Sequence, residues 1–346
     1  MKQHIIALDL LRTLLAICVM LFHFGVKDLG KAFLSVDIFF ILSGFVLSIR
    51  YFDDKNITFT SFAFDRFVRI YPLFFIACVL SCCIHNPSTW HKVSSLFLVQ
   101  MLNLGTDILG YPFPSWSLSV EIWIGILVFW PIFANLRYTN NVNQVMAMFA
   151  LIIYGYIYYF NKSLPNPFDV HVVSNSVFTM GELRCIAGLL LGYSLYFVYR
   201  AKIIEAFSAI TINITTLLLI VVTAMLFSGK VDDRIFLLAT PLLIITLSSK
   251  KCLLNRCKGK VLGVFAKMSY SVYLFHQVVW DFMAKFNIAY FNILTKHQQQ
   301  VFASVPVLLI CIPITIYIEP FLIKKTRAIL LKKFGSGTLS KSISSL

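Results

Sequence analysis

The chain has 346 residues, of which 59% are hydrophobic and only 13% are charged. Soluble globular domains carry about 25% charged residues, so this composition excludes a soluble protein and predicts an integral membrane protein in contact with the lipid bilayer. The formal net charge of +15 would suit a nucleic-acid-binding protein. We expect no nucleic-acid partner, however, because the basic residues lie mostly in loops between apolar runs, as the positive-inside rule predicts.

The first apolar run, residues 5–24, is long enough as a helix to cross a hydrocarbon core of ~30 Å. It nevertheless contains Asp9, Arg12 and His23. Arg12 and His23 are eleven residues apart, so at about 100° per residue their side chains leave one face of the helix, roughly 16 Å apart along its axis. Asp9 precedes Arg12 by three residues and can pair with it. Because ionisable groups inside a membrane helix are costly, this face predicts a polar site.

Ten apolar windows along the chain predict membrane-spanning helices. They cover residues 5–24, 34–49, 71–84, 116–134, 144–160, 183–199, 207–228, 235–249, 268–284 and 300–319. If the N-terminus is cytoplasmic, most lysines and arginines outside these windows also fall on the cytoplasmic side. We therefore predict an all-α integral membrane protein with about ten transmembrane helices and both termini in the cytoplasm. We find no internal repeat, which weakens the interpretation as an inverted-repeat transporter.

Residues 57–72 connect the second and third predicted spans. Phenylalanines alternate there with charged residues, which is typical of an amphipathic helix lying at the inner membrane interface, and Pro72 follows. Arg66 and Arg69, one turn apart, point the same way, and two neighbouring guanidinium groups suit bidentate contacts with phosphates. Anchoring to lipid headgroups is the alternative interpretation.

The remaining segments carry less information. The tail at residues 335–346 is rich in Ser and Gly, which predicts a disordered cytoplasmic tail after a membrane domain at residues 1–334. Most of the eight cysteines lie in apolar runs, where a free thiol behaves as a small hydrophobe. Cys252 and Cys257 lie in a Lys-rich loop without further ligands for zinc, so we expect no metal site.

Five of the predicted spans carry ionisable groups into the outer half of the bilayer. Besides His23, these groups are Asp37, Glu121, Glu182, Arg184 and His276. Their shared depth indicates a polar cavity. Such a cavity could relay protons in a transporter, or it could support group transfer to a hydroxyl, with a neutral histidine as general base and a carboxylate that orients it. Phosphate-binding arginines on the cytoplasmic side and a base on the outer side of the membrane favour group transfer from a phosphorylated cytoplasmic donor.

Seven segments in order along nearly the whole chain form a recognisable pattern. They are Arg12 with His23, SVDIFFILSGF at 35–45, RFVRIYP at 66–72, SWSLSVEIW at 115–123, RCIAGLLLG from Arg184, SYSVYLFHQ at 269–277 and YIEPF at 317–321. Together they resemble acyltransferase family 3. One departure is that Leu10 and Thr13 stand beside Arg12 where the family commonly has smaller residues, which changes helix packing and removes no chemistry.

The resemblance implies an O-acyltransferase, most commonly an acetyltransferase, that uses acetyl-CoA and modifies sugar hydroxyls of bacterial surface polysaccharides, lipopolysaccharide or related glycolipids. It implies that His23 in the first helix is essential and that Arg66 and Arg69 serve donor binding or conformation. On this interpretation His23 takes the proton of the attacking hydroxyl, and Asp37 or Glu121 sets its tautomer. A covalent acyl-histidine route stays open as an alternative.

Four further residues, Asp9, Arg12, Arg184 and His276, are expected to support this site structurally or electrostatically. Acyl-CoA would be a co-substrate, with no permanently bound cofactor, and the acceptor would be a glycan or glycolipid. The expected location is the inner or plasma membrane, as a multi-pass protein, and association into a homo-oligomer is left open. The alternative function is a proton-coupled or lipid-linked-sugar transporter. The number of buried charges disfavours a third class, a non-catalytic membrane sensor.

Overall fold

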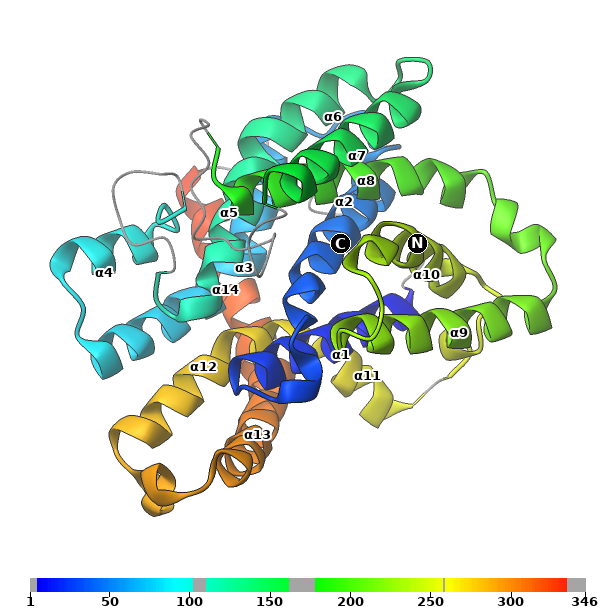
Figure 1. Cartoon of the computed structure of the whole chain (residues 1–346). Coiled ribbons are helices and arrows are strands. Elements are labelled where there is room, and N and C mark those ends of the chain that lie inside the picture. The colour runs from blue at the N-terminus through cyan, green and yellow to red at the C-terminus, as the bar shows by residue number, and fades with distance from the viewer. Residues whose placement is uncertain (1–4, 102–109, 162–177, 258, 335–346) are drawn as a thin grey trace.

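The computed structural model describes residues 5–101, 110–161, 178–257 and 259–334. The predicted tail at 335–346 lies outside these residues. The described residues form helices and connecting turns, with no strand among them (Figure 1). The helices are α1 Ile6–His23, α2 Ser35–Tyr51, α3 Phe59–His85, α4 Thr89–Leu96, α5 Trp116–Ile124, α6 Trp130–Leu136, α7 Val142–Asn161, α8 Met180–Arg200, α9 Ala209–Phe227, α10 Phe236–Ser248, α11 Lys260–Lys267, α12 Ser269–Lys285, α13 Lys296–Pro313 and α14 Glu319–Phe334.

The prediction of an all-α protein with several membrane-spanning helices is confirmed. In the described part of the chain, eight helical stretches are long and apolar enough to cross a membrane. The two other predicted spans correspond to α10 and α12, which have 13 and 17 residues. The count of ten spans and the cytoplasmic location of both termini stay predictions.

Two of the long stretches contain a widened turn where two helices join. Residues 125–129 link α5 to α6 and residues 314–318 link α13 to α14, both as π-helical turns. Each turn lies two residues before a proline, Pro131 in one case and Pro320 in the other. Proline has no backbone N–H and crowds the preceding turn, so the helix widens here.

α3 corrects the predicted boundary between an interfacial helix and the third span. Residues 59–85 form one continuous helix, so the amphipathic stretch is its first half and Pro72 lies inside it. Thr58 caps the start of the helix, and its hydroxyl accepts a hydrogen bond from the Ser61 backbone N–H in a reciprocal capping box. This continuity carries Arg66 and Arg69 into the bundle.

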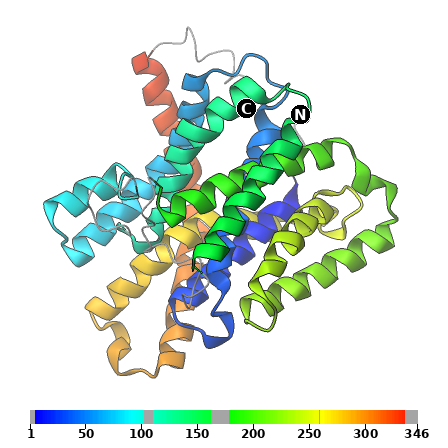
Figure 2. The same cartoon turned by 45° about the horizontal axis from the view of Figure 1, so that its top comes forward.

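The centre of the molecule is the contact between α2 and α8, which both views place between two lateral helix pairs, α12 with α13 and α9 with α10 (Figures 1 and 2). Glycines allow the close approach. A Cβ atom at Gly44 would collide with the backbone of Leu189, and one at Gly192 would collide with the backbone of Ile41. Small residues that let two backbones meet are typical of helix contacts in membranes.

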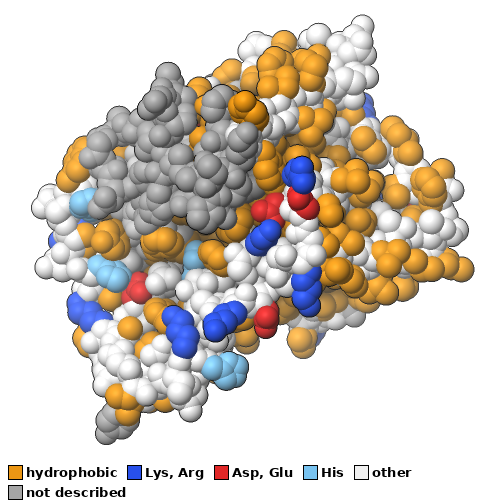
Figure 3. Space-filling view, in the orientation of Figure 1, with side chains coloured by type: hydrophobic (Ala, Val, Ile, Leu, Met, Phe, Trp, Pro, Cys, Tyr) orange, Lys and Arg blue, Asp and Glu red, His pale blue; other side chains and the backbone are white. Residues whose placement is uncertain are grey.

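The outward faces of the lateral helices are apolar. On α9, Ile210, Leu217 and Leu218 each expose at least 60% of their surface. Figure 3 shows hydrophobic side chains over much of the face that carries α9 and α10. Exposed leucine and isoleucine at this density would be unfavourable in water and suit contact with lipid tails.

Candidate functional site

A cavity of about 690 Å³ lies between α1, α2, α3, α5, α12 and α14. It follows α2 from Val36 near the start of that helix to Tyr51 at its end, a distance of about 22 Å. Seven basic and four acidic side chains line it, which gives it an excess of positive charge suited to an anionic ligand. These residues are Asp9, Arg12, Arg50, Asp65, Arg66, Arg69, Glu121, Lys267, Glu319, Lys324 and Arg327.

One end of the cavity is held by Asp65, a residue that the sequence analysis did not single out. Its carboxylate accepts hydrogen bonds from Arg50 at 2.8 Å and from the Tyr51 hydroxyl at 3.0 Å, and Arg327 lies 3.4 Å from its other oxygen. These contacts connect α2, α3 and α14. The sequence offered one signal for Asp65, which directly precedes Arg66 in an amphipathic stretch. It offered no signal for Arg327, which is distant in the chain.

The predicted arginine pair divides into two different environments. Arg66 is buried, and its Nη2 donates to Glu121 Oε1 at 2.9 Å, while Ser43 donates to the same carboxylate oxygen at 2.5 Å. Arg66 is therefore part of the bundle interior, which contradicts a headgroup anchor at this position. Arg69 is exposed, lines the cavity and makes no ion pair with a described residue.

The pairing predicted for the first helix is confirmed. Arg12 Nη1 lies 3.9 Å from Asp9 Oδ1, and both side chains line the cavity. Because an arginine inside a membrane helix requires a partner or a polar cavity, Arg12 satisfies the requirement in both ways. His23, three turns further along α1, lies outside the lining of this cavity.

His23 instead contacts His276 in the middle of α12. His23 Nδ1 and His276 Nε2 are 2.8 Å apart, and His276 Nδ1 lies 3.0 Å from the carbonyl oxygen of Val272. His276 is fully buried, whereas His23 is half-buried. Packing of Phe24 on Trp280, with ring centroids 4.5 Å apart, keeps the two helices together at this level.

Asp37 and Glu121, one of which was predicted to set the tautomer of His23, have partners other than His23 in the structure. Asp37 makes a bidentate ion pair with Arg184, with N–O distances of 2.6 and 3.1 Å, and both side chains are buried. Glu121 is occupied by Arg66 and Ser43. Sequence position carried no information on which neighbour each of these carboxylates faces.

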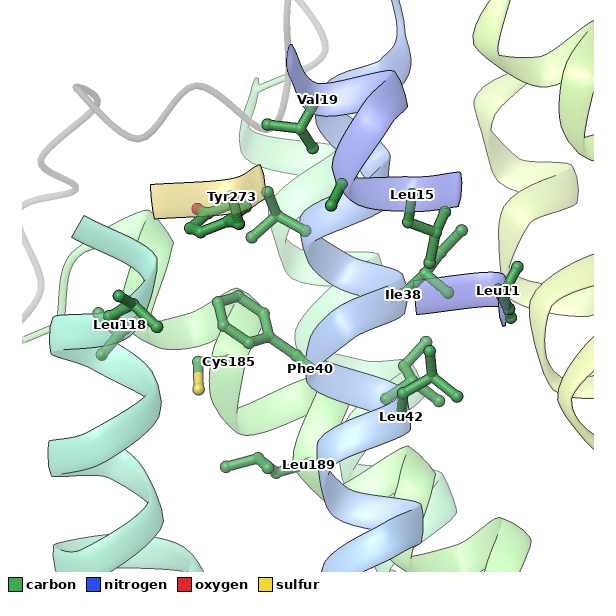
Figure 4. Packing of buried hydrophobic residues seen from close by; sticks show 14 of the residues in the cluster. Leu11, Leu15, Val19, Ile38, Phe40, Leu42, Leu118, Cys185, Leu189 and Tyr273 are labelled. Carbon is green, nitrogen blue, oxygen red and sulfur yellow. The ribbon is translucent and has the colours of Figure 1, made fainter. Parts of the chain in front are cut away.

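Tyr273 separates the cavity from the two histidines. Its ring lines the cavity and lies 6.2 Å from the His276 ring, between centroids. Its hydroxyl donates to the Pro114 carbonyl at 2.9 Å and is 2.6 Å from the Ser117 hydroxyl. Figure 4 shows Tyr273 among the apolar side chains of the neighbouring helices. The Tyr273 ring therefore lies between the cavity and His276.

These contacts define three groups of polar residues: the cavity, the histidine pair beyond Tyr273, and the separate Asp37–Arg184 pair. All eight cysteines are free thiols. No cluster of three or more histidine, cysteine or acidic side chains among the described residues is arranged to hold a metal ion.

Comparisons with known proteins agree with the resemblance drawn from the motifs. Residues 5–318 match the family described as an acyltransferase domain. The Acyltransferase MdmB of Streptomyces mycarofaciens is 41% identical over 99 residues, a stretch that covers 25% of this chain and 25% of that protein. No solved structure is significantly similar to the chain. Because the family match extends over nearly all of the sequence, the chain belongs to acyltransferase family 3.

Proposed function

We propose that the chain is a membrane-embedded O-acyltransferase that moves an acyl group, most commonly acetyl, from cytoplasmic acyl-CoA to a sugar hydroxyl of a surface or exported polysaccharide or glycolipid. The observation that carries this proposal is a long basic cavity whose far end, at Tyr273, lies beside a histidine pair. An anionic donor and a base that activates a hydroxyl are the two requirements of such a transfer.

The proposed topology has ten spans, with α10 and α12 completing the eight long ones, in the inner or plasma membrane. Both termini are cytoplasmic in this arrangement. Arg50 and Lys267 then lie at the cytoplasmic ends of α2 and α11, and Lys324 lies in α14 beyond the last predicted span, on the side where a donor from the cytoplasm would enter. The short lengths of α10 and α12 are compatible with spanning because a bilayer can thin locally around a short helix.

The donor would bind with its phosphates among the basic side chains. Arg69 is the strongest candidate because its guanidinium faces the cavity without an ion pair to a described residue. Charge-assisted contacts from guanidinium groups to phosphate are short and favourable. The slender, uncharged pantetheine arm would extend along α2 toward Tyr273.

The chemistry would use His23 as general base. The acceptor oxygen attacks the thioester carbonyl, so that a C–O bond forms while the C–S bond breaks. The ring of His23 takes the hydroxyl proton and passes it to the leaving thiolate, which departs as the free thiol of CoA. A two-step route through an acylated His23 would require the same residue and would differ by leaving a labelled enzyme when acceptor is omitted.

The direct test uses purified protein in proteoliposomes with labelled acetyl-CoA and an extract of surface glycan. The proposal predicts label on the glycan that depends on His23. The alternative function, proton-coupled or lipid-linked-sugar transport, predicts solute flux with no covalent change and no requirement for acyl-CoA. Mass analysis of the glycan from cells with and without the protein would identify the acceptor.

A further inference from the structure

We infer that His276 is a positioning residue that holds His23 in a single tautomer, with its proton on Nδ1 and with Nε2 unprotonated toward the acceptor hydroxyl. This inference rests on the proposed function for its catalytic meaning, but the tautomer itself can be measured without substrate. It replaces the carboxylate expected from the sequence with a neutral imidazole.

The backbone of α12 fixes which nitrogen of His276 carries the proton. The carbonyl oxygen of Val272 can only accept a hydrogen bond, so His276 Nδ1, which lies 3.0 Å away, must carry a hydrogen. A neutral imidazole has one N–H, and His276 Nε2 is therefore an acceptor. At 2.8 Å from it, His23 Nδ1 must be the donor, which leaves the lone pair of His23 on Nε2.

The two other assignments are less favourable. If His276 carried its proton on Nε2, its bare Nδ1 would face the Val272 carbonyl, and two acceptors would meet at hydrogen-bond distance. If His276 were an imidazolium, a charge would be fully buried, and none of the described residues places a carboxylate in contact with either ring. A buried charge without a partner is expensive.

The surroundings support a fixed geometry. His23 packs edge-on against Phe113, with ring centroids 5.6 Å apart, and His276 lies against Phe24 and Tyr273. His23 Nε2 has no hydrogen-bond partner among the described residues. The contact with His276 therefore decides which nitrogen of the His23 ring carries the proton.

This arrangement also assigns a role during proton transfer. When His23 Nε2 takes the hydroxyl proton, its Nδ1–H bond to His276 becomes charge-assisted and strengthens. The Val272 carbonyl polarises His276 in the same direction, because hydrogen bonds in a chain reinforce one another. In serine proteases a buried aspartate performs the corresponding service for the catalytic histidine.

The tautomer is tested by nitrogen NMR on full-length protein with labelled histidine rings in lipid nanodiscs. The His23 signals are identified by their loss in His23→Gln. We expect a protonated Nδ1 and an unprotonated Nε2 in the wild type, and a mixture of tautomers in His276→Phe. A wild-type His23 with its proton on Nε2 would overturn the inference.

Activity measurements on two His276 variants, with amide side chains of different length, distinguish a positioning role from a packing role. In His276→Gln the amide oxygen falls near the position of Nε2 and can accept from His23, whereas in His276→Asn the amide lies near the Val272 carbonyl and cannot reach His23. We expect Gln to retain kcat within about tenfold and Asn to lose roughly 100-fold, with KM for acetyl-CoA unchanged in both. Equal kcat values for the two variants would contradict positioning. A wild type without transferase activity would refute the proposed function, and the NMR result would still decide the tautomer.

Discussion

At the scale of single residues, the two arginines of one motif have different roles. Arg66 is buried and paired, whereas Arg69 faces the cavity. Arg66 donates to Glu121 inside the bundle, and Arg69 makes no ion pair with a described residue. The sequence could show only that they share a helix face. Which of them has a carboxylate opposite depends on how α5 packs against α3.

We therefore expect separate effects from the two alanine substitutions. Arg66→Ala leaves the half-buried carboxylate of Glu121 without its ion-pair partner and should lower the free energy of unfolding by about 3 kcal/mol. Arg69→Ala should leave stability unchanged and weaken acetyl-CoA binding by about 1.5–3 kcal/mol, the loss of one charge-assisted contact. Thermal unfolding in detergent and calorimetric CoA titration measure the two. Equal loss of CoA affinity without destabilisation in Arg66→Ala would contradict this division.

Tyr273 offers a second residue-scale prediction. Its hydroxyl is held by Ser117 and by the Pro114 carbonyl, and its ring lies between the cavity and His276. Tyr273→Phe keeps the ring and removes the restraint, so the ring should turn aside more easily. We expect faster hydrolysis of acetyl-CoA in the absence of acceptor, measured as free thiol. Ser117→Ala removes one of the same contacts and should give a smaller change in the same direction, and no change in either variant would argue against a barrier at Tyr273.

At the scale of helices, the contact between α2 and α8 positions the buried Asp37–Arg184 pair. That contact depends on glycines at Gly44 and Gly192, where any side chain would meet the backbone of the opposite helix. The RCIAGLLLG segment predicted a helix at this place. The sequence could not show that its glycines allow a close approach, because the partner helix α2 was not known.

Gly192→Leu should force α2 and α8 apart and destabilise the protein by more than about 3 kcal/mol, since overpacking against a backbone cannot be relieved by a side-chain rotation. Gly155→Ala in α7 is the matched control, because a Cβ at that position meets nothing within 4 Å. Alanine there should stabilise the helix by about 0.5–1 kcal/mol. Thermal unfolding of both variants in the same detergent is the measurement, and a stable Gly192→Leu would contradict the tight crossing.

At the scale of the whole molecule, hydrophobic runs predicted the helices well, because the bilayer imposes length and apolarity on any span. The boundary at Pro72 was wrong, since proline can remain inside a long helix that has neighbours to satisfy the freed carbonyl. Pairing between residues distant in sequence, such as His23 with His276 or Asp65 with Arg327, was not predictable from one sequence. It depends on helix order in space.

The proposed ten-span topology has its own test. Reporter fusions after Leu346 and after Lys285 should indicate cytoplasmic and external locations respectively, because the lysine- and arginine-rich loops then lie inside. Two reporters on the same side would contradict it. A fusion after Arg200, expected to be cytoplasmic, checks the topology of the chain before these two positions.

The central claim, that His23 activates the acceptor hydroxyl for acyl transfer, is tested most directly by the transfer rate of His23→Gln in proteoliposomes. Glutamine keeps polar contacts and similar size but cannot take a proton at neutral pH. We predict a loss of roughly 10²–10⁴-fold in the transfer rate with CoA affinity and thermal stability close to wild type. Full acetylation of the glycan by a well-folded His23→Gln protein would contradict the account.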